Sequence, residues 1–314
     1  MKKLCALALC LALCVGLLPS AAWAAGPEVK AKAVLLMEKS TGDILYEEHG
    51  EEPLELASVT KVMTMLLIME ALEDGTLTPD TMVAVSANAA GMGGSQVYMK
   101  EGETFSVHDM LKAIAVASGN DAAAALAEKV AGISDRFVEK MNQRAAELGM
   151  EDTHFANTHG YHNEDHYTTA YDLALITREA LKNETFAEIV ATKSKTIRDG
   201  TQTITNHNKM LNMYQGCVGV KTGFTKKTGR CLVSSAKRDG KQVVAVTLNA
   251  PDDWNDHTNM LNFAFENTVC FPLIAAGMTV NSVTVKNGTS QSLELTAERD
   301  FYLSESPDTK FKNA

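Results

Sequence analysis

Ser58 and Lys61 are the first residues along the chain whose types and spacing could do chemistry. They stand three positions apart at the start of an apolar segment with helical spacing, and residues three apart share one face of a helix. The N-terminus of a helix presents free N–H groups and the positive end of its dipole. That setting favours an anionic oxygen on Ser58 and, with partial burial, a lowered pKa for Lys61. A neutral lysine within hydrogen-bond reach can then act as general base for the serine.

Two later tripeptides could complete such a site, although each also has a plain structural interpretation. Ser118 and Asn120 flank a glycine between two helical patterns, which is typical of a helix end followed by an asparagine N-cap. Lys221, Thr222 and Gly223 lie on a predicted strand. There an amine and a hydroxyl beside a residue without a side chain could hold a carboxylate and let a substrate backbone approach. The first pair has a plain alternative too, because a serine cap followed by an exposed lysine gives the same spacing.

The spacing of apolar residues predicts the elements that position these side chains in the first two thirds of the chain. Two strands form a hairpin around a Ser-Thr-Gly-Asp turn, at 33–38 and 44–48. A helix begins at Ser58 and stops at Gly75. Ser134 and Thr168 are expected to cap the third and fourth of four further helices. These helices are predicted over 107–118, 121–131, 135–148 and 169–183.

After about residue 218 the apolar period changes to two, which is typical of strands. Three consecutive strands are expected, at 219–222, 230–237 and 242–249. Arg238-Asp239-Gly240 turns the second hairpin, and a helix follows at 258–266. Alternation resumes beyond residue 275, with a turn at Asn287-Gly288. Strands at both ends with helices between them predict an α+β fold, an antiparallel sheet covered by a helical cluster.

The composition is that of a globular protein with an export signal. The chain has 314 residues, 45% hydrophobic and 22% charged, which favours one large domain with a small appendage over a disordered chain. Lys2 and Lys3 precede an apolar run at 4–18, and Ala22-Trp23-Ala24 offers a cleavage site after Ala24. Because the run is shorter than the roughly 20 residues of a spanning helix, residues 1–24 are interpreted as a cleaved signal peptide.

The net charge of the chain disfavours two kinds of binding partner. The net charge of −10 becomes −12 once Lys2 and Lys3 are removed, since residues 1–24 hold no acids. This charge argues against binding to nucleic acid and against electrostatic docking on an anionic membrane.

After export three cysteines remain, Cys217, Cys231 and Cys270, either as one bridge with a free thiol or as three buried thiols. We favour three buried thiols, because a large core needs no disulfide.

Together and in this order, the three motifs resemble the penicilloyl-serine transferase family, which holds penicillin-binding proteins and class A β-lactamases. Within it the chain is similar to the low-molecular-mass D-alanyl-D-alanine carboxypeptidases over about residues 28–270. The similar stretches are 57–64, 94–97, 102–103, 157–160 and 166–174. The resemblance implies a β-lactamase/transpeptidase-like fold with a helical subdomain and a short C-terminal β extension.

The resemblance also implies a role for each matching residue. Ser58 would attack the carbonyl of the penultimate D-alanine of a peptidoglycan stem peptide and form an acyl-enzyme, which water then releases. Lys61 would accept the serine proton, and Ser118 would help to relay a proton to the leaving amine. β-Lactam antibiotics would acylate the same serine. These steps require no metal and no cofactor.

Substrate binding would fall to the later motif residues. Asn120 would bind the substrate amide, while Lys221 and Thr222 would hold the terminal carboxylate. The oxyanion hole would be the N–H groups of Ser58 and Phe224. Several relatives carry an arginine shortly after the last core strand, but here residues 252–257 hold none. Carboxylate binding would then rest on the strand motif, with Arg230 as a further candidate.

Four alternatives compete with this interpretation. A class A β-lactamase would carry Asp at the position of Gly119 and a downstream Glu, which residues 155–159 do not offer. A D,D-endopeptidase on the same scaffold is barely separated by the sequence. A catalytically silent cell-wall binding protein is disfavoured because every motif is intact. A zinc peptidase would use four crowded loop residues without the usual helical pairing, namely His159, His162, Asp165 and His166.

The expected organisation is a signal peptide at 1–24, a D,D-peptidase domain at 28–274 and a partial β-rich domain at 275–314. Asp256 and His257 are expected to start a helix rather than to catalyse. Relatives usually continue into a full β domain and an amphipathic helix that rests on the membrane. Since residues 308–314 are polar, no membrane anchor is evident. The protein is expected outside the cytoplasm, either at the cell wall or membrane or released, and the chain could be truncated.

Overall fold

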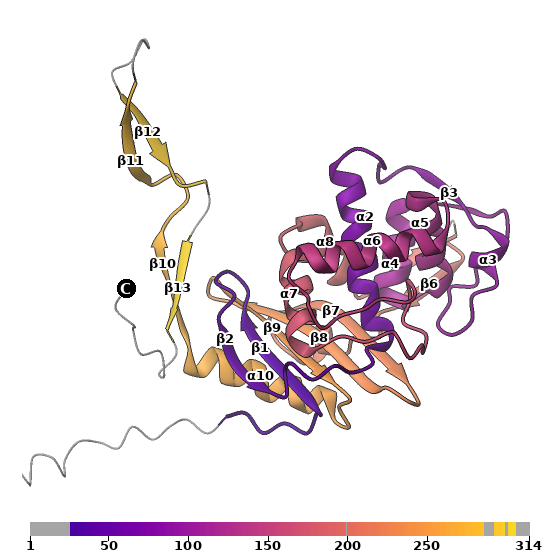
Figure 1. The fold of residues 1–314 in the computed structure, drawn as a ribbon, viewed down its shortest axis with the longest axis horizontal. Coiled ribbons are helices and arrows are strands. Elements are labelled where there is room, and N and C mark those ends of the chain that lie inside the picture. Colours follow the sequence, from indigo (N-terminus) through magenta and orange to yellow (C-terminus); the bar gives the residue numbers. More distant parts are fainter. Residues whose placement is uncertain (1–25, 199, 286–291, 299–300, 306–314) are drawn as a thin grey trace, which may run out of the picture.

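A five-stranded antiparallel sheet forms the centre of the molecule in a computed structural model that describes residues 26–198, 200–285, 292–298 and 301–305. The strand order is β2-β1-β9-β8-β7, so the strand that carries Lys221 lies at one edge (Figure 1). The strands are β1 (Ala33–Glu38), β2 (Ile44–Glu48), β7 (Cys217–Thr225), β8 (Gly229–Arg238) and β9 (Lys241–Leu248). The predicted α+β class is therefore confirmed.

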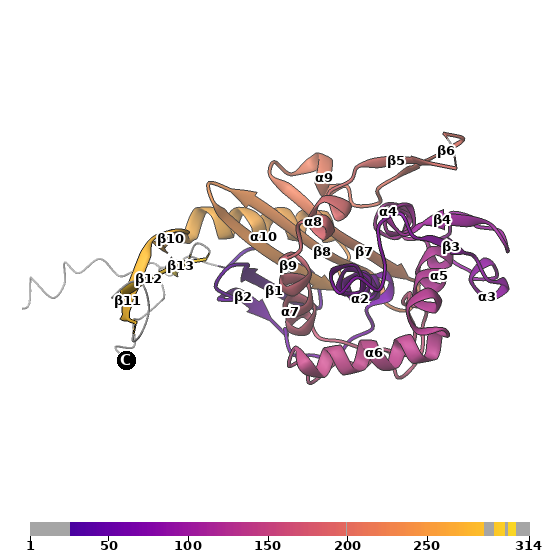
Figure 2. The same ribbon diagram turned by 90° about the horizontal axis from the view of Figure 1, so that it is seen from above.

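Helices cover both faces of this sheet (Figure 2). One side carries a large cluster that begins with α2 (Lys61–Glu73). Its other long helices are α4 (Val107–Ala117), α5 (Asn120–Ala131), α6 (Ser134–Glu147), α7 (Ala170–Ala180) and α8 (Glu184–Val190). The other side is covered by α10 (Asp253–Asn267) and the short α9 (Met210–Met213).

The alternation of β1 explains why both faces need a cover. Leu35 and Met37 belong to the larger core, beneath α2 and α7, whereas Val34 and Leu36 belong to the core beneath α10. All four side chains are buried. Since successive strand residues point to opposite faces, a strand with apolar residues on both faces lies between two layers.

Shorter elements surround the large helical cluster. Two small two-stranded sheets were not predicted, β3 (Met82–Ala84) with β4 (Thr104–Ser106) and β5 (Ser194–Ile197) with β6 (Gln202–Thr205). One four-residue helix, α3 (Ala87–Ala90), follows β3, and a 3-10 turn, η1 (Ala57–Thr60), precedes α2. Ser58 therefore lies in a tight turn just before the helix it was expected to begin.

Two predicted helix caps are wrong. The cap of α6 is Ile133, and Ser134 is its first helical residue, because α5 ends at Ala131 and leaves only Gly132 and Ile133 to turn the chain. The cap of α7 is Thr169, whose side chain accepts a hydrogen bond from the Asp172 N–H. Thr168 remains extended because its backbone N–H and carbonyl both pair with Leu54.

Other helix boundaries differ from the prediction, while the turn at Asp239-Gly240 is confirmed. The helix predicted over 169–183 ends at residue 180, and α8 follows as a separate helix. The helix predicted over 258–266 begins five residues earlier, at Asp253. Asp239 and Gly240 have φ angles of 48° and 82°, as a two-residue hairpin turn of type I′ requires.

Two small sheets follow α10 and lie apart from the main sheet in Figure 1. One pairs β10 (Val269–Ile274) with β13 (Phe301–Glu305), and the other pairs β11 (Thr279–Thr284) with β12 (Ser292–Thr296). Side chains on β11 and β12 are exposed. The predicted turn at 287–288, the signal peptide and residues 308–314 lie outside the described residues. The division at 274/275 stays a prediction.

Cys217 and Cys231 carry free thiols. Cys231 is buried as expected, whereas Cys217 is only half-buried, so the expectation of burial is wrong for this residue. The side chain of Cys270 lies outside the described set. Among the helices that the structure describes, none combines the length and apolar character needed to cross a bilayer.

Candidate active site

The hydroxyl of Ser58 and the amine of Lys61 are in direct contact. Lys61 is the first residue of α2, and its Nζ lies 3.0 Å from Oγ of Ser58 in a hydrogen bond. The same Nζ donates to the carbonyl oxygen of His159 at 2.7 Å. The turn η1 delivers Ser58 to this position with Ala57 at a φ of 46°, a left-handed conformation that is strained for a residue with a side chain.

Burial makes the amine of Lys61 a base. Its side chain is fully buried, and this burial, together with the positive charge of Lys221, holds the pKa of Lys61 well below the usual lysine range. Asp121 acts in the opposite direction and is the smaller influence. A lysine that loses its proton this readily can accept one from a serine hydroxyl at hydrogen-bond distance.

The loop at 154–168 holds the nucleophile turn in place. His166 Nδ1 accepts a hydrogen bond from the Ala156 N–H at 2.9 Å, and His166 Nε2 lies 2.7 Å from Thr60 Oγ1. This arrangement puts the imidazole proton on Nε2. Thr60 Oγ1 in turn donates to the carbonyl of Ala57 at 2.7 Å. Burial and nearby His159 lower the pKa of His166 to about 3, so the ring is neutral.

Ser118 and Asn120 lie at the junction between α4 and α5. Ser118 ends α4 in the left-handed conformation, with a φ of 57°. Both side chains are buried, and neither Ser118 Oγ nor Asn120 Oδ1 has a hydrogen-bond partner among the described atoms. Asn120 Nδ2 donates to the carbonyl of Gly93 at 2.7 Å. Buried polar atoms are rarely left unpaired, so this junction is equipped to bind a further group.

The strand motif lies against the nucleophile. A Cβ at Gly223 would be only 3.1 Å from the backbone nitrogen of Ser58, so a side chain there would push β7 away from η1. Lys221 is buried on the same face of β7, and its Nζ donates to the carbonyl of Thr222 at 2.8 Å. Burial lowers the pKa of Lys221 to about 7. Thr222 and Phe224 alternate with these residues and are half-buried and exposed.

A cavity of about 350 Å³ opens over Ser58. Of the residues predicted for the site, it is lined by Ser58, Ser118, Thr222, Gly223 and Phe224. Three other predicted residues do not line it and lie buried around it, namely Lys61, Asn120 and Lys221. The cavity thus exposes the nucleophile to a ligand and keeps the two lysine side chains away from water.

Comparisons with known proteins show the family of the chain. Residues 20–252 match the family model described as D-alanyl-D-alanine carboxypeptidase. The chain belongs to this family. It is 42% identical over 273 residues to the D-alanyl-D-alanine carboxypeptidase DacF of Bacillus subtilis, covering 85% of this chain and 70% of that protein. It is 31% identical to DacD of Escherichia coli, covering 88% and 74%.

Solved structures of penicillin-binding proteins share the fold. Penicillin binding protein 5 from Haemophilus influenzae superimposes with a TM-score of 0.79 at 27% identity, covering 90% of this chain and 85% of that one. Penicillin binding protein 6B from Escherichia coli gives 0.78 at 29% identity, covering 90% and 86%. As a member of the D-alanyl-D-alanine carboxypeptidase family, the chain is a serine-type hydrolase.

Six residues that line the cavity of this carboxypeptidase were not among the predicted site residues. They are Ser95, His207, Lys209, Arg230, Asp253 and Trp254. Ser95 falls in a stretch that already resembled the family, and Arg230 had been considered for carboxylate binding. His207 gave no signal in the sequence, because it reaches the cavity through a contact between its N–H and the distant carbonyl of Val116.

The side chains of the three histidines considered for zinc have other partners in this carboxypeptidase. Both ring nitrogens of His166 are engaged by Thr60 and Ala156. His162 is half-exposed at the surface, with Nδ1 3.1 Å from a carboxylate oxygen of Glu55. No three His, Cys, Asp or Glu side chains gather as metal ligands anywhere in the described part of the chain.

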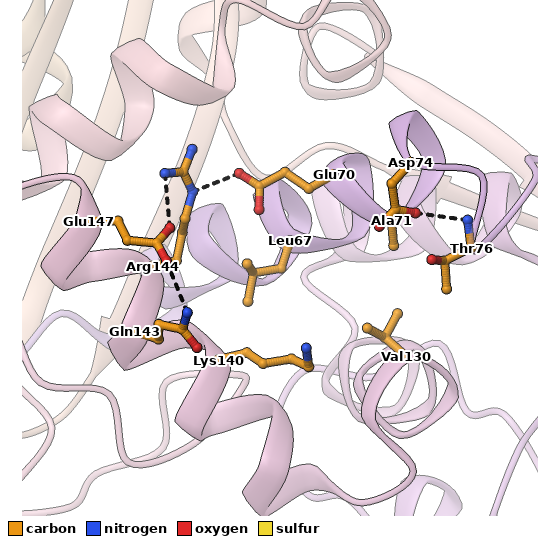
Figure 3. Close-up of a pocket in the computed structure, with 10 residues that line it drawn as sticks. All are labelled: Leu67, Glu70, Ala71, Asp74, Thr76, Val130, Lys140, Gln143, Arg144 and Glu147. Atoms are coloured by element: carbon orange, nitrogen blue, oxygen red, sulfur yellow. Dashed lines mark hydrogen bonds and ion pairs between the residues drawn. The ribbon is translucent and has the colours of Figure 1, made fainter.

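A second cavity, of about 400 Å³, lies between α2 and α6 (Figure 3). Arg144 points into it and is paired with Glu70 at 2.7 Å and with Glu147 at 3.4 Å. Figure 3 shows paired charges and no serine or cysteine along this wall. The cavity over Ser58 is therefore the candidate active site of this carboxypeptidase.

Proposed function

We propose that this chain removes the terminal D-alanine from peptidoglycan stem pentapeptides through an acyl-enzyme on Ser58. The observation that carries the proposal is the 3.0 Å contact between Ser58 Oγ and a fully buried Lys61 amine, at the floor of an open cavity. A base of this kind is needed because a free serine hydroxyl is a weak nucleophile. Membership of the D-alanyl-D-alanine carboxypeptidase family supports the choice of substrate.

The reaction begins when Ser58 Oγ attacks the carbonyl carbon of the penultimate D-alanine and its proton passes to Lys61. The N–H groups of Ser58 and Phe224 stabilise the oxyanion, and one such donor lowers the activation free energy by about 3 kcal/mol. The C–N bond then breaks, and the leaving amine takes the proton from Lys61 with Ser118 as relay. Water attacks the resulting ester, with Lys61 as base, and frees Ser58.

Substrate binding rests on the two other motifs. The unpaired Oδ1 of Asn120 is an acceptor that can bind a substrate N–H. Lys221 and the hydroxyl of Thr222 hold the terminal carboxylate. The substrate backbone lies along β7, an edge strand of the main sheet that Gly223 lets approach the turn of Ser58. A carboxylate beside Lys221 raises the pKa of this amine from about 7 and keeps it charged.

β-Lactam antibiotics are expected to acylate Ser58 as well and to be released slowly, because residues 155–159 offer no glutamate to activate water. The acidic charge supports a partner other than nucleic acid. Action on peptidoglycan requires export, which the signal sequence at 1–24 supports. The peptidase domain is proposed to span 28–274 and the β-rich part 275–314.

Intact mass spectrometry with benzylpenicillin tests the proposal. One covalent adduct is expected, mapping to Ser58 and absent in Ser58→Ala. Release of D-alanine from a D-Ala-D-Ala-terminated pentapeptide should disappear in the same variant. An adduct that persists in Ser58→Ala overturns the assignment of the nucleophile. An adduct without release of D-alanine favours the endopeptidase or the silent protein instead.

A further inference from the structure

One wall of the cavity over Ser58 is an arginine clamped by the first turn of α10. Arg230 on β8 donates from Nε to Asp253 Oδ1 at 2.7 Å. Its guanidinium carbon lies 5.1 Å from the ring centroid of Trp254. Asp253 and Trp254 are the first two residues of α10, and all three side chains line the cavity. The guanidinium is therefore held in one place before any ligand arrives.

The register of the sheet puts Arg230 on the same face as Thr222. Arg230 pairs with Phe224 across β7 and β8, and Leu232 pairs with Thr222. Since cross-strand partners and every second residue share a face, the side chains of Thr222, Phe224 and Arg230 all project toward α10. A long side chain reaches such a diagonal neighbour. Lys221 projects to the opposite face, so the two cations flank the edge of β7 from both sides.

The guanidinium retains donors for a ligand. The hydrogen bond described for Arg230 uses Nε, and among the described contacts none uses its two terminal nitrogens. Its side chain is 42% exposed, whereas Asp253 is only 4% exposed. Within the described lining of the cavity, Asp253 is the only acid, while Lys209 and His207 add positive or protonatable groups. A ligand in this cavity therefore meets a cationic wall, in which the one carboxylate is already paired with Arg230.

We infer that Arg230 is a specificity-determining residue that binds the free C-terminal carboxylate of the substrate, with Asp253 and Trp254 as its positioning residues. The inference rests on the proposed function and deepens it. A planar guanidinium matches a carboxylate through two parallel N–H bonds. An amide, as found at an internal crosslink, offers one acceptor oxygen and no charge. The clamp thus selects peptide ends over crosslinks and favours the carboxypeptidase over the endopeptidase.

The test compares two peptides that end in D-Ala-D-Ala, one with a free carboxylate and one with a C-terminal carboxamide. The parent enzyme is expected to prefer the acid. In Arg230→Ala, kcat/KM for the acid should fall roughly 10- to 100-fold, as expected for loss of a hydrogen bond to a charged group. The loss should appear in KM, while kcat/KM for the amide stays unchanged. Added guanidinium chloride at millimolar concentration should restore part of the preference.

Three further variants separate recognition from structure. Asp253→Asn should weaken the preference in the same direction, because the guanidinium loses its anchor. Arg230→Lys should keep part of the preference for the acid over the amide. This variant replaces Arg230→Ala if Arg230→Ala does not fold. The matched control is Arg238→Ala, at the far end of β8, where Arg238 is likewise stacked on the rings of Tyr214 and Phe265. It should leave the ratio of acid to amide unchanged.

Labelling with a neutral fluorophosphonate, which carries no carboxylate, separates the role of Ser58 as nucleophile from the role of Arg230 in binding a carboxylate. Ser58 should be labelled equally in the parent enzyme and in Arg230→Ala. If Ser58 is not labelled in the parent enzyme, the proposed function fails. If Ser58 is labelled and the acid is preferred equally by the parent enzyme and the Arg230 variants, only the role of Arg230 is overturned, and the clamp merely ties α10 to the sheet.

Discussion

The α-carbon of Gly160 lies directly against the carbonyl group of Ala57, so closely that a Cβ on Gly160 would overlap the carbonyl oxygen. Gly160 has a φ of 92°, which only glycine adopts without strain. This contact presses the loop that contains His159 onto the turn that contains Ser58. It therefore sets the distance between the nucleophile and the carbonyl that holds Lys61.

Gly160→Ala should disable the site and destabilise the protein. The new methyl group must displace either the loop or η1, which we expect to cost about 3 kcal/mol of unfolding free energy. Acylation of Ser58 by benzylpenicillin should be lost. The control is Gly149→Ala, at a φ of 76° with no atom near the added Cβ. It carries only the backbone strain, about 1 kcal/mol, and should be acylated normally. Equal acylation of both variants would contradict the role of the contact.

An element of the fold could be predicted from the sequence where neighbouring residues determine it. The bounds of β1 and β2 were predicted to the residue, because a run of apolar residues and a turn sequence specify them. The start of α10 was missed by five residues, because its reasons are tertiary. Asp253 binds Arg230, and Asp256 accepts a hydrogen bond from the Lys30 N–H at 2.9 Å. Neither partner is near in sequence.

The same distinction applies to the site. Ser58 and Lys61 share one turn, so their spacing allowed a contact, and the three motifs together favoured it over a serine cap beside an exposed lysine. The partner of Lys61 at the His159 carbonyl lies 98 residues away, and nothing in the spacing could indicate it. The contacts of Arg230 with Asp253 and Trp254 likewise join β8 to α10, whose first turn has the polar sequence typical of a loop. Motifs therefore indicated the candidate reacting groups, whereas the walls of the cavity emerged only from the packing.

Ser118→Ala should separate activity from stability. The buried Ser118 hydroxyl has no hydrogen-bond partner among the described atoms, so its removal should change the unfolding free energy by less than about 1 kcal/mol. Proton relay by a positioned side chain is worth about 100- to 10,000-fold. We expect kcat for release of D-alanine to fall within that range. Steady-state kinetics and urea unfolding of the same preparation check both halves.

Ser234→Ala provides the matched control, since it removes another buried serine hydroxyl. Ser234 Oγ is hydrogen-bonded to His257 Nδ1 at 2.5 Å and does not line the cavity. Its loss leaves a buried ring nitrogen unpaired, which costs about 1–3 kcal/mol, while kcat should be retained. The expectation for Ser118 would be wrong if both variants lost stability equally or if Ser118→Ala kept full activity.

The pH dependence of kcat/KM should report two buried lysines. Lys61 must be neutral to act as base, so activity is lost as the pH falls through its pKa, which burial and Lys221 hold well below the usual range. Lys221 must be charged to bind a carboxylate, so kcat/KM should also fall as the pH rises above about 7. Because bound substrate raises the pKa of Lys221, the alkaline fall in kcat should occur at higher pH.

Lys221→Arg tests the alkaline limb. An arginine stays protonated throughout this range, so the fall in kcat/KM above about pH 7 should vanish even if the absolute rate is lower. The acid limb, which belongs to Lys61, should remain. An alkaline limb that persists unchanged in Lys221→Arg would show that another group causes it.

Three buried histidines should make the fold sensitive to acid. Burial lowers the pKa of His159 to about 4 and those of His166 and His257 to about 3. An unfolded histidine binds its proton near pH 6.5, so between that pH and the folded pKa values the unfolded state binds more protons. Stability is therefore lost as the pH falls through this window, by about 1.4 kcal/mol per pH unit for each histidine.

His257→Gln isolates one of these contributions. The ring of His257 is fully buried in α10, between the hydroxyls of Ser234 and Thr247, and does not line the cavity. Glutamine can keep a hydrogen bond but does not titrate. Urea unfolding at a series of pH values between 6 and 4 should show a slope smaller by about 1.4 kcal/mol per pH unit than in the parent enzyme. An unchanged slope would mean that His257 takes up no extra proton on unfolding, and that the acid sensitivity has another source.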